Sequence, residues 1–441
     1  MTHRSMPDGG PARPETRTSH GRSNSRVKSE QTPRLTPPWV QPAAVPVVAA
    51  TAPLQLLSSG ELARRALATR IKTEAQAVGL SVSAITTADP LAGLDSMLQS
   101  HIGAGHISGL DWFTPERASF STDPRNLLPT AQSIVAVGIA YWPGETVKPN
   151  DGTPRGRIAR YAWGGDYHSL LKHRMRAFHE RIEHIAGEQI EARFLVDTAR
   201  IVDRAVASRS GLGWYGKNAC LIVPGYGSWV LLGVLLLDLD VEPDRPLNHD
   251  CGRCQICLTR CPTGAIVAPY TVSTPRCLSF QTIEQRGAIP RELRPLLGDW
   301  VFGCDVCQEV CPYTGAAETM DDVELRPRSI DNAFPSLHRL LRLSAAEFQV
   351  LYRGTAVTRA KRRGLARNAA VALGNVGSEA DIDLLTSVLA EHDEPLVREH
   401  AAWALGSIGG PRSRAALDRQ RRLEPTSDVL REIELTLATV S

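Results

Sequence analysis

The pattern of apolar and polar side chains predicts one long helix followed by several strands in the first half of the chain. Over residues 60–80, the apolar positions that share one helical face are Leu62, Leu67, Ile71, Ala75 and Val78. Residues 81–88, 133–142 and 192–198 are instead rich in β-branched and aliphatic side chains, a composition typical of strands. Helical and extended segments therefore follow each other in this part of the chain.

Further segments complete the same domain. Residues 219–241 contain two β-rich runs on either side of Pro224–Gly227, which predicts a hairpin that turns there. Helices are expected over residues 166–186 and 200–210. Together these segments predict an α+β domain over residues 59–245, which is large enough to bury its own core and to hold a cofactor.

The C-terminal part of the chain contains an internal repeat. The segments "AAVALGNVG" (369–377) and "AAWALGSIG" (401–409) are identical at six of nine positions. Repeated apolar helices that end in Leu-Gly indicate stacked helix pairs, which bury a continuous core between neighbours. We therefore expect a HEAT-like helical repeat domain over residues 335–441.

Composition and charge narrow the class of protein. Residues 1–58 are rich in Pro, Ser, Thr, Arg and Gly, which predicts a disordered N-terminal extension. The longest apolar run, Trp229–Leu237, is much shorter than the roughly 20 residues that span a bilayer, so no membrane partner is expected. With 50 basic and 47 acidic residues, net charge alone does not indicate nucleic-acid binding. We expect a cytoplasmic monomer.

Eight of the nine cysteines lie between residues 251 and 311, which argues against a disulfide framework spread over the chain. The first four have the spacing C-x2-C-x2-C-x3-C-P of bacterial ferredoxins, in which the fourth cysteine ligates the other of two clusters. A second set of four follows. We therefore predict a ferredoxin-like module over residues 246–325 with two [4Fe–4S] clusters. The first cluster is expected on Cys251, Cys254, Cys257 and Cys311, and the second on Cys261, Cys277, Cys304 and Cys307.

Two structural zinc sites are the alternative, because zinc sites also use CxxC pairs. Three cysteines in one short run, however, place too many ligands in one turn for an ordinary zinc ribbon. Cys220 stands apart from both sets and is expected to be a buried apolar residue. Since iron–sulfur clusters carry single electrons, the α+β domain is expected to hold their acceptor.

Several stretches together resemble one known family, the epoxyqueuosine reductases. In family order they are "RYAWGGDYH" (160–168), "FLVDTARIVDRA" (194–205), "GLGWYGKNACLI" (211–222), the cysteine segment and "RAKRRGLARNAAVALGN" (359–375). The resemblance covers about residues 60–440. It implies a nitroreductase-like cobalamin-binding domain, a two-cluster module and HEAT-like helices. It also implies an oxidoreductase that converts epoxyqueuosine at position 34 of tRNA to queuosine, the last step of queuosine biosynthesis.

The resemblance changes the interpretation of Asp197. This residue lies where a strand is expected to end and a helix to begin, and an aspartate there is commonly an N-cap. The alternative is a carboxylic acid that burial keeps protonated, so that it can donate its proton. The residues alone favour the N-cap, whereas the resemblance implies that Asp197 is the catalytic proton donor.

The resemblance also implies a set of cofactor contacts. The sequence has no D-x-H-x-x-G run, so cobalamin is expected to bind without the histidine ligand that this motif supplies. The family often has a basic residue where this chain has Thr122, and Arg117 or Arg125 is expected to substitute for it. The stretch "GLGWYGKN" is either a tight turn or backbone that approaches a macrocycle, with Lys217 reaching a polar substituent. The expected cofactor-binding residues are Tyr161, Asp166, Tyr167, His168, Lys217, Asn218, Leu221, Ser228, Leu232, Gln281, Asp305 and Val306.

A basic segment opens the repeat module. The stretch "TRAKRRGLARN" (358–368) is either a solvated helix face or a stripe that neutralises phosphates. The resemblance to enzymes that act on tRNA favours the second, and a base that undergoes chemistry must be presented unstacked. The expected tRNA-binding residues are Arg359, Lys361, Arg362, Arg363 and Arg367.

Two other functions remain open at this point. A reductive dehalogenase-like corrinoid enzyme would share the plan of cobalamin and two clusters but would lack helices such as those expected over residues 335–441. A non-catalytic iron–sulfur electron carrier would leave the large α+β domain without a role. The preferred interpretation requires two partners, a tRNA that carries epoxyqueuosine and an external low-potential electron donor.

Overall fold

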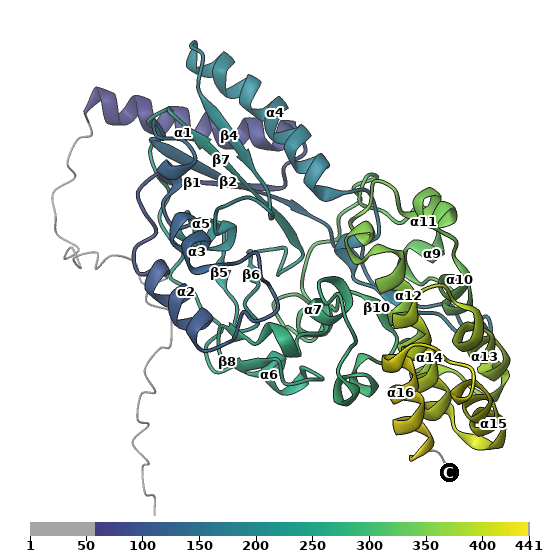
Figure 1. The fold of residues 1–441 in the computed structure, drawn as a ribbon. Coiled ribbons are helices and arrows are strands. Elements are labelled where there is room, and N and C mark those ends of the chain that lie inside the picture. The colour runs from purple at the N-terminus through teal and green to yellow at the C-terminus, as the bar shows by residue number, and fades with distance from the viewer. Residues whose placement is uncertain (1–57, 440–441) are drawn as a thin grey trace, which may run out of the picture. The chain divides into compact units, whose positions relative to one another are not determined.

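The computed structural model describes residues 58–439, and Figure 1 shows how their helices and strands are arranged. The disordered extension predicted over residues 1–58 lies outside the described residues except for Ser58. The elements of the N-terminal part are α1 (Ser59–Ala77), β1 (Val82–Thr87), α2 (Leu94–Gly103), α3 (Pro115–Phe120), β2 (Ser133–Ala140), β3 (Arg157–Ile158), α4 (Tyr167–Ala186), β4 (Ala192–Leu195), α5 (Asp203–Arg209), β5 (Trp214–Tyr215), β6 (Leu221–Ile222) and β7 (Val230–Leu237).

A four-stranded antiparallel sheet in the order β1-β2-β7-β4 forms the centre of this part. Every residue of β2 is buried. Because successive side chains of a strand point to opposite faces, both faces of the sheet must be covered. Helices α1 and α4 pack on one face with Val135 and Val137, and α2, α3 and α5 pack on the other with Ile134 and Ala136 (Figure 1). The structure is therefore a mixed helix–strand fold in three layers.

Most elements predicted for this part are confirmed. Strands lie within residues 81–88, 133–142 and 192–198, and helices lie within 166–186 and 200–210. Helix α1 occupies most of 60–80, and Ile71 and Ala75 are fully buried on it as expected. Leu62, however, is exposed near the start of α1, so the apolar face begins later than the pattern predicts.

The prediction of a hairpin over residues 219–241 is wrong. Strand β6 pairs with β5, whereas β7 pairs with β2 on one side and with β4 on the other. Because both edges of β7 are occupied, β6 has no free edge of β7 to pair with. The predicted turn does exist, since Val223 and Gly227 form an isolated bridge, but the chain leaves it to enter the main sheet.

The cysteine region consists of short elements. They are α6 (Ile256–Arg260), β8 (Ile266–Ala268), β9 (Thr271–Val272), α7 (Leu278–Ile283), β10 (Trp300–Phe302) and α8 (Val306–Glu309). Strand β10 pairs in parallel with β3, which ties this region to the N-terminal part. One apolar core continues from Leu278 and Phe302 into the C-terminal helices.

The C-terminal part is helical. Its elements are α9 (Ile330–Ala333), α10 (Leu337–Arg342), α11 (Ala345–Tyr352), the 3-10 helix η6 (Ala356–Ala360), α12 (Lys361–Val376), α13 (Ile382–Glu391), α14 (Pro395–Ile408), α15 (Gly410–Arg421) and α16 (Ser427–Leu437). The two repeated segments lie on α12 and α14, which pack against each other. A Cβ atom added to Gly374 would lie 2.8 Å from the Ala404 Cα, so the repeated glycine permits this close approach. No helix among the described residues is long and apolar enough to cross a bilayer.

Candidate functional site

Asp197 lies in the loop between β4 and α5, and it is not an N-cap. Helix α5 begins at Asp203, and its N-cap residue is Val202. The Asp197 backbone has a φ of +39°, which non-glycine residues adopt only when their surroundings hold them there. The interpretation that the residues alone favoured is therefore wrong, and a carboxylate is presented on a constrained loop.

The start of α4 holds this carboxylate. The Tyr167 hydroxyl donates to Asp197 Oδ2 over 2.8 Å, and His168 Nε2 lies 3.3 Å from the same oxygen. The other imidazole nitrogen of His168 lies 2.8 Å from Asp166 Oδ1, and Asp166 also caps α4 by accepting from the His168 backbone N–H. The ring of Tyr161 packs edge-on against Tyr167. Four residues predicted as cofactor contacts are thus brought together around Asp197.

Hydrogen bonding sets the charges in this group. Burial raises the pKa of Asp197, but hydrogen bonds from His168 and Tyr167 outweigh it and hold that pKa below its usual value. Hydrogen bonds to Asp166 and then to Asp197 raise the pKa of His168 to about 9. The expectation that burial keeps Asp197 protonated is therefore wrong: its side chain is 55% exposed, and near neutral pH the proton of the pair resides on His168.

Arg117 supports the loop from outside. Its guanidinium donates to the backbone oxygen of Thr198 over 3.0 Å and lies over the ring of Trp112. Arg125 instead forms an ion pair with Asp89 at 3.2 Å. Of the two arginines expected to substitute for a basic residue at Thr122, only Arg117 contacts the residue that follows Asp197.

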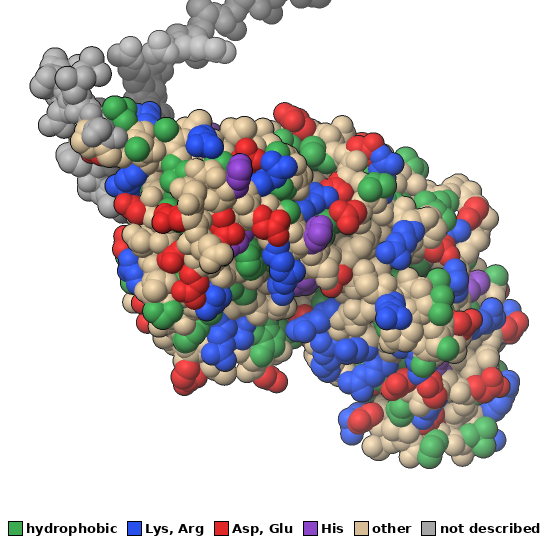
Figure 2. Space-filling view, turned by 90° about the horizontal axis from the view of Figure 1, so that it is seen from above, with side chains coloured by type: hydrophobic (Ala, Val, Ile, Leu, Met, Phe, Trp, Pro, Cys, Tyr) green, Lys and Arg blue, Asp and Glu red, His purple; other side chains and the backbone are tan. Residues whose placement is uncertain are grey.

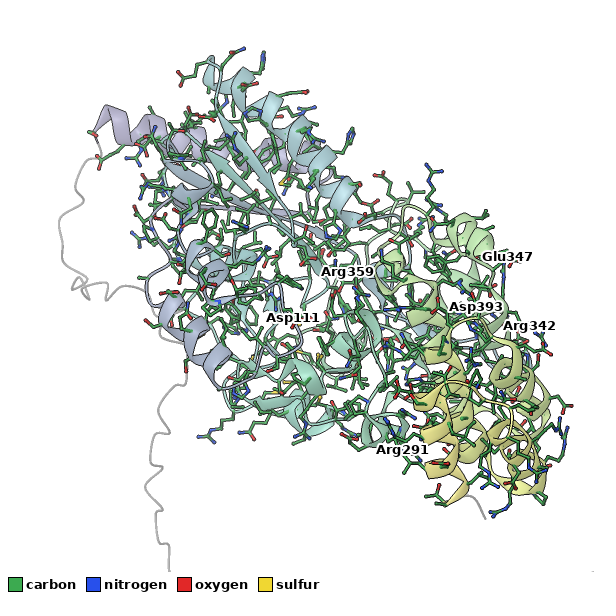
Figure 3. All side chains as sticks on the ribbon, viewed as in Figure 1. Asp111, Arg291, Arg342, Glu347, Arg359 and Asp393 are labelled. Carbon is green, nitrogen blue, oxygen red and sulfur yellow. The ribbon has the colours of Figure 1, made fainter. Side chains whose placement is uncertain are left out.

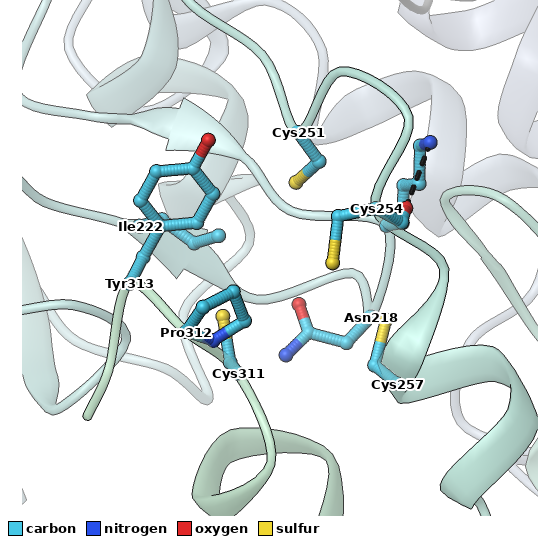
Figure 4. Close-up of a pocket in the computed structure, with 9 residues that line it drawn as sticks. Asn218, Ile222, Cys251, Cys254, Cys257, Cys311, Pro312 and Tyr313 are labelled. Atoms are coloured by element: carbon cyan, nitrogen blue, oxygen red, sulfur yellow. Dashed lines mark hydrogen bonds between the residues drawn. The ribbon is translucent and has the colours of Figure 1, made fainter. Parts of the chain in front are cut away.

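The first cysteine set lines one cavity. Cys251, Cys254 and Cys257 surround it together with Cys311 from much later in the chain (Figure 4). Lys217 lines the same cavity and is only 8% exposed. Its ammonium donates to the backbone oxygens of Gly252, over 2.7 Å, and Cys254, over 2.9 Å. Lys217 is thus held against the first cysteine loop, which corrects the expectation that it reaches a substituent of a macrocycle.

The second set of cysteines also converges. Burial, and then the charges of Cys277, Asp305 and Cys261, raise the pKa of Cys304 to about 12. The hydrogen bond with Cys220, burial, and the charges of Cys220, Cys304 and Cys277 raise the pKa of Cys307. The ninth cysteine, Cys220, is half-buried and lies within hydrogen-bonding distance of the Cys307 thiol. It therefore does not stand apart, as the sequence suggested, but adjoins the second set.

Two predicted contacts link the cysteine region to its surroundings. Asn218 lines the first cavity and donates from Nδ2 to the backbone oxygen of Cys307 over 3.3 Å, so it lies between the two cysteine sets. The Ser228 hydroxyl donates to Gln308 Oε1 over 3.0 Å. Gln308 was not predicted, because its role depends on a contact between distant segments.

The other predicted contacts are less accessible. Gln281 donates from Nε2 to the Pro275 backbone oxygen over 2.6 Å, while its buried Oε1 has no hydrogen-bond partner. Leu221 is buried, and Leu232 and Val306 are partly buried against the apolar cores. Because they are buried or partly buried, these residues could contact a cofactor only as part of the wall of the cofactor's binding site.

Asp305 is engaged by a residue that sequence reasoning missed, Arg160. The Asp305 carboxylate accepts from the Arg160 backbone N–H over 2.8 Å and pairs with its guanidinium at 3.3 Å. The same guanidinium lies 5.0 to 5.6 Å from the ring centres of Trp142, Trp163 and Trp229. Arg160 and Trp163 both belong to the quoted stretch 160–168, but Trp142 and Trp229 are too far away in the sequence to indicate the role of Arg160.

The basic segment divides into exposed and buried arginines. Arg359, labelled in Figure 3, is exposed and forms a bidentate pair with Glu284. Lys361 and Arg363 are exposed, whereas Arg362 is half-buried and paired with Asp393, also labelled in Figure 3. Arg286, which was not predicted, adjoins them and donates to the Arg359 backbone oxygen over 2.9 Å. Figure 2 shows lysine and arginine side chains gathered beside a hollow on one face of the molecule.

Arg367 is a correction to the predicted tRNA contacts. It is fully buried, and its guanidinium donates to the backbone oxygens of Gln281, Gln285 and Gly287. Arg363 and Arg367 are four residues apart and share one face of α12, but at Arg367, one turn further along, that face is covered by the segment 281–287. Arg367 therefore joins α12 to the α7 segment and is unavailable to a phosphate.

Three family models match parts of the chain. Residues 122–198 match the epoxyqueuosine reductase QueG model, residues 250–314 match a 4Fe-4S double cluster binding domain, and residues 356–438 match HEAT repeats. The second match favours iron–sulfur clusters over the zinc alternative. The match to HEAT repeats agrees with the repeat found in the sequence.

Several related proteins and solved structures match this chain over most of its length. The epoxyqueuosine reductase of Salmonella typhimurium is 38% identical over 344 residues, which are 77% of this chain and 88% of that protein. A crystal structure of an epoxyqueuosine reductase with an epoxyqueuosine-modified stem loop of tyrosine tRNA is 32% identical, with a TM-score of 0.79 over 85% of this chain and 98% of that one. A structure of the Bacillus subtilis enzyme, with its catalytic aspartate loop swung out of the active site, is 31% identical, with a TM-score of 0.79 over 85% of this chain and 99% of that one. By identity and coverage, this chain belongs to the epoxyqueuosine reductase family.

Proposed function

We propose that the protein reduces epoxyqueuosine in tRNA to queuosine. The observation that carries this proposal is the Asp197 carboxylate, held by Tyr167 and His168 on a constrained loop, in a chain of this family whose sequence also contains two sets of four cysteines. Loss of an epoxide oxygen requires electrons and protons, and these two features supply both. The proposal implies three functional parts, over residues 59–245, 246–325 and 335–441.

Asp197 is proposed to deliver the proton to the epoxide oxygen. A substrate that covers its exposed carboxylate would desolvate it, and desolvation raises the pKa of a carboxyl group toward the value of a useful acid. His168, whose pKa is raised to about 9, would hold the proton until then and pass it from Nε2 to the carboxylate. The structure of the Bacillus subtilis enzyme with its catalytic aspartate loop swung out of the active site supports a loop that moves when the contacts of Asp197 to Tyr167 and His168 are broken.

Two [4Fe–4S] clusters are proposed on the cysteine sets. The first would be held by Cys251, Cys254, Cys257 and Cys311, and the second by Cys261, Cys277, Cys304 and Cys307. Their crossed arrangement is supported by the cavity that Cys311 shares with the first three cysteines and by the match to a double-cluster domain. Thiolates are the ligands such clusters require, and the clusters would supply single electrons.

Cobalamin is proposed as the acceptor of these electrons in a nitroreductase-like domain. The Gln281 side chain fits this cofactor in one respect, because its orphaned Oε1 could accept from an amide N–H, and amides surround a corrin ring. Asp166, Tyr161, Tyr167 and His168 would line the side that faces the substrate. When bound, the cofactor would supply the reducing cobalt centre, while the chain positions the substrate, excludes water and holds the proton.

The tRNA is proposed to bind along Arg359, Lys361, Arg362 and Arg363, extended by Arg286. Arg286 and Arg363 are adjacent, since Arg363 Nη2 donates to the Arg286 backbone oxygen over 3.4 Å. Phosphate contacts of this kind position an RNA without reading its sequence. The modified base would then have to leave the stack to reach Asp197.

The test is conversion of the modified base by the complete protein. The full chain is reconstituted anaerobically with iron, sulfide and cobalamin and given tRNA that carries epoxyqueuosine and a chemical reductant. Nucleoside analysis of the digested tRNA should show queuosine in place of epoxyqueuosine. Absence of queuosine from protein that contains both clusters and bound cobalamin would refute the proposed function.

A further inference from the structure

The segment around the first cysteine set carries charge of one sign only. Residues 251–277 contain Arg253, Arg260 and Arg276 and no aspartate or glutamate. The rest of the chain is nearly balanced in charge, so this segment departs from the average. The nearest acidic residue in the sequence is Asp250, whose carboxylate accepts from the Gly252 backbone N–H.

The same segment is exposed where it passes the first cavity. Arg253 and Arg260 are exposed, and neither forms an ion pair with any described residue. Ile256 lies between two predicted ligands, Cys254 and Cys257, and is 43% exposed. Val267, on the neighbouring strand β8, is 45% exposed.

We call these four exposed residues the donor face. Helix α6 packs against β8, and both lie below α2, β5 and β6 in the view of Figure 1. Arg276 borders the donor face, since its guanidinium donates to the Thr263 backbone oxygen next to β8. The donor face thus combines two apolar side chains with a basic rim, directly over the loop that carries Cys254 and Cys257.

The residues on either side of Cys304, in the second cysteine set, are buried instead. Asp305, between Cys304 and Cys307, is only 1% exposed and is paired with Arg160. Gly303 in the same loop lies against Tyr161 and Ala159, and the Tyr161 ring contacts Tyr167, which holds Asp197. The second set therefore lies on the side of the proposed reaction site. The first set, of which Cys251, Cys257 and Cys311 are themselves buried, lies beneath the exposed Arg253 and Ile256.

We propose that the donor face, made of Arg253, Ile256, Arg260 and Val267, docks an acidic one-electron carrier protein. This inference rests on the proposed function, which needs electrons from outside the chain. One electron passes from the reduced carrier to the oxidised first cluster, the carrier is oxidised by one electron, and no atom is transferred. Complexes for electron transfer are small and weak, and complementary charge raises their association rates.

An RNA would also be attracted to basic residues, but the donor face suits a protein better. Ile256 and Val267 at its centre offer no stacking surface or hydrogen bond to a nucleotide, whereas apolar side chains inside a charged rim are typical of protein interfaces. A surface placed over the first cluster also shortens the path of the electron. Loss of tRNA affinity in the variants below would instead assign this surface to RNA.

The test measures cluster reduction in the absence of tRNA, so it does not depend on turnover. Reduced flavodoxin, an acidic carrier, is mixed with the reconstituted holoprotein, and bleaching of the clusters is followed by stopped flow. In R253E/R260E the second-order rate constant should fall at least about tenfold, within the range of electrostatic steering, and its dependence on salt should change sign, because the reversed charges repel an acidic carrier. R253Q/R260Q should give a smaller fall.

Controls separate docking from damage. R65E reverses an exposed arginine on α1 and should leave the rate constant unchanged. Reduction by photoreduced deazaflavin, which needs no docking surface, should proceed at the wild-type rate in all variants, with unchanged iron content. An unchanged rate with flavodoxin in R253E/R260E, an equal fall with both reductants in both double variants, or a parallel loss of tRNA affinity would overturn the proposal.

Discussion

His168 Nε2 lies 3.3 Å from the Asp197 carboxylate, close enough for a proton to pass between the two side chains. Because the pKa of His168 is raised to about 9 and that of Asp197 is lowered, the imidazole carries the proton near neutral pH. The sequence-based prediction was that Asp197 itself carries this proton. The pair as a whole is the proton source in the proposed mechanism.

Replacement of Asp197 tests the role of the acid. D197N should lower the turnover rate by about 10²- to 10⁴-fold, the usual contribution of general acid catalysis. Its iron content, bound cobalamin and reduction by a chemical reductant should remain as in the wild type, since Asp197 lies outside both cysteine sets. Turnover is measured as queuosine formed per protein in a single-turnover assay. Activity close to that of the wild type in D197N would exclude Asp197 as the proton donor.

The pH dependence of turnover follows from the charge of His168. The pKa of this histidine is raised, so the proton is present below about pH 9 and is lost as the pH rises through that value. Turnover should therefore fall on the alkaline side near pH 9. Hydrogen bonding to Asp166 is the largest cause of the raised pKa, so D166N should move the alkaline limb to lower pH. Asparagine is also a good N-cap, so α4 should stay intact.

The control for D166N is its thermal stability near pH 6. Unfolding should occur at nearly the wild-type temperature there, because the cap is retained. If the alkaline limb of D166N coincides with that of the wild type, His168 does not store the proton.

The crossed cysteine assignment predicts an asymmetric effect of C261S. This substitution should remove about half of the iron and the spectroscopic signal of the second cluster, while the signal of the first cluster remains. C220S is the matched control, because Cys220 adjoins Cys307 but belongs to neither set, and it should retain both signals. Anaerobic iron analysis and electron paramagnetic resonance separate the outcomes. Loss of the first signal in C261S would contradict the crossed assignment.

Lys217 should tune the first cluster. Its buried ammonium lines the cavity of that cluster and is held by two backbone oxygens of the cysteine loop, and a positive charge stabilises the more negative, reduced cluster. In K217M the equilibrium constant for reduction of the first cluster should fall by up to tenfold. This corresponds to a decrease of about 59 mV in the reduction potential of a one-electron couple. A potentiometric titration of both clusters measures this shift. The second cluster should keep its potential.

Two further variants control for the effect of Lys217. K217R keeps the charge and should restore most of the shift. K72M removes a lysine whose partner is Asp244 on the outside of the fold and should change neither potential. An equal shift of both clusters in K217M would indicate a general structural change instead of a local charge effect.

The sequence predicted those parts of the molecule that depend on local spacing. The cysteine runs place three thiols around one cavity by their own geometry, and the ferredoxin pattern supplied the fourth, Cys311. The repeat on α12 and α14 was visible because both helices must present the same small residues to each other. The error at β6 and β7 arose because a turn was present at Val223–Gly227, while strand pairing depended on partners far away in the sequence.

The polar contacts at the site were harder to predict because they depend on which way a side chain points. Asp197 looked like an N-cap since strand, aspartate and helix follow in the right order, yet α5 begins six residues later. Lys217 and Arg367 both carry a charge that usually stays in water. Both are buried because backbone oxygens from distant segments accept their hydrogen bonds.

The two kinds of arginine in the basic segment can be separated by experiment. R367Q should destabilise the protein by at least about 2 kcal/mol, because three backbone oxygens lose a buried donor. R363Q changes an exposed side chain and should alter the stability by less than about 0.5 kcal/mol.

The same two variants should differ in tRNA binding. R363Q should weaken tRNA binding and lower the slope of log affinity against log salt by about one. In R367Q that slope should equal the wild-type value at temperatures where the variant is folded. Denaturant unfolding and tRNA binding at several salt concentrations measure both effects, and a reduced slope in R367Q would return Arg367 to the RNA-binding surface.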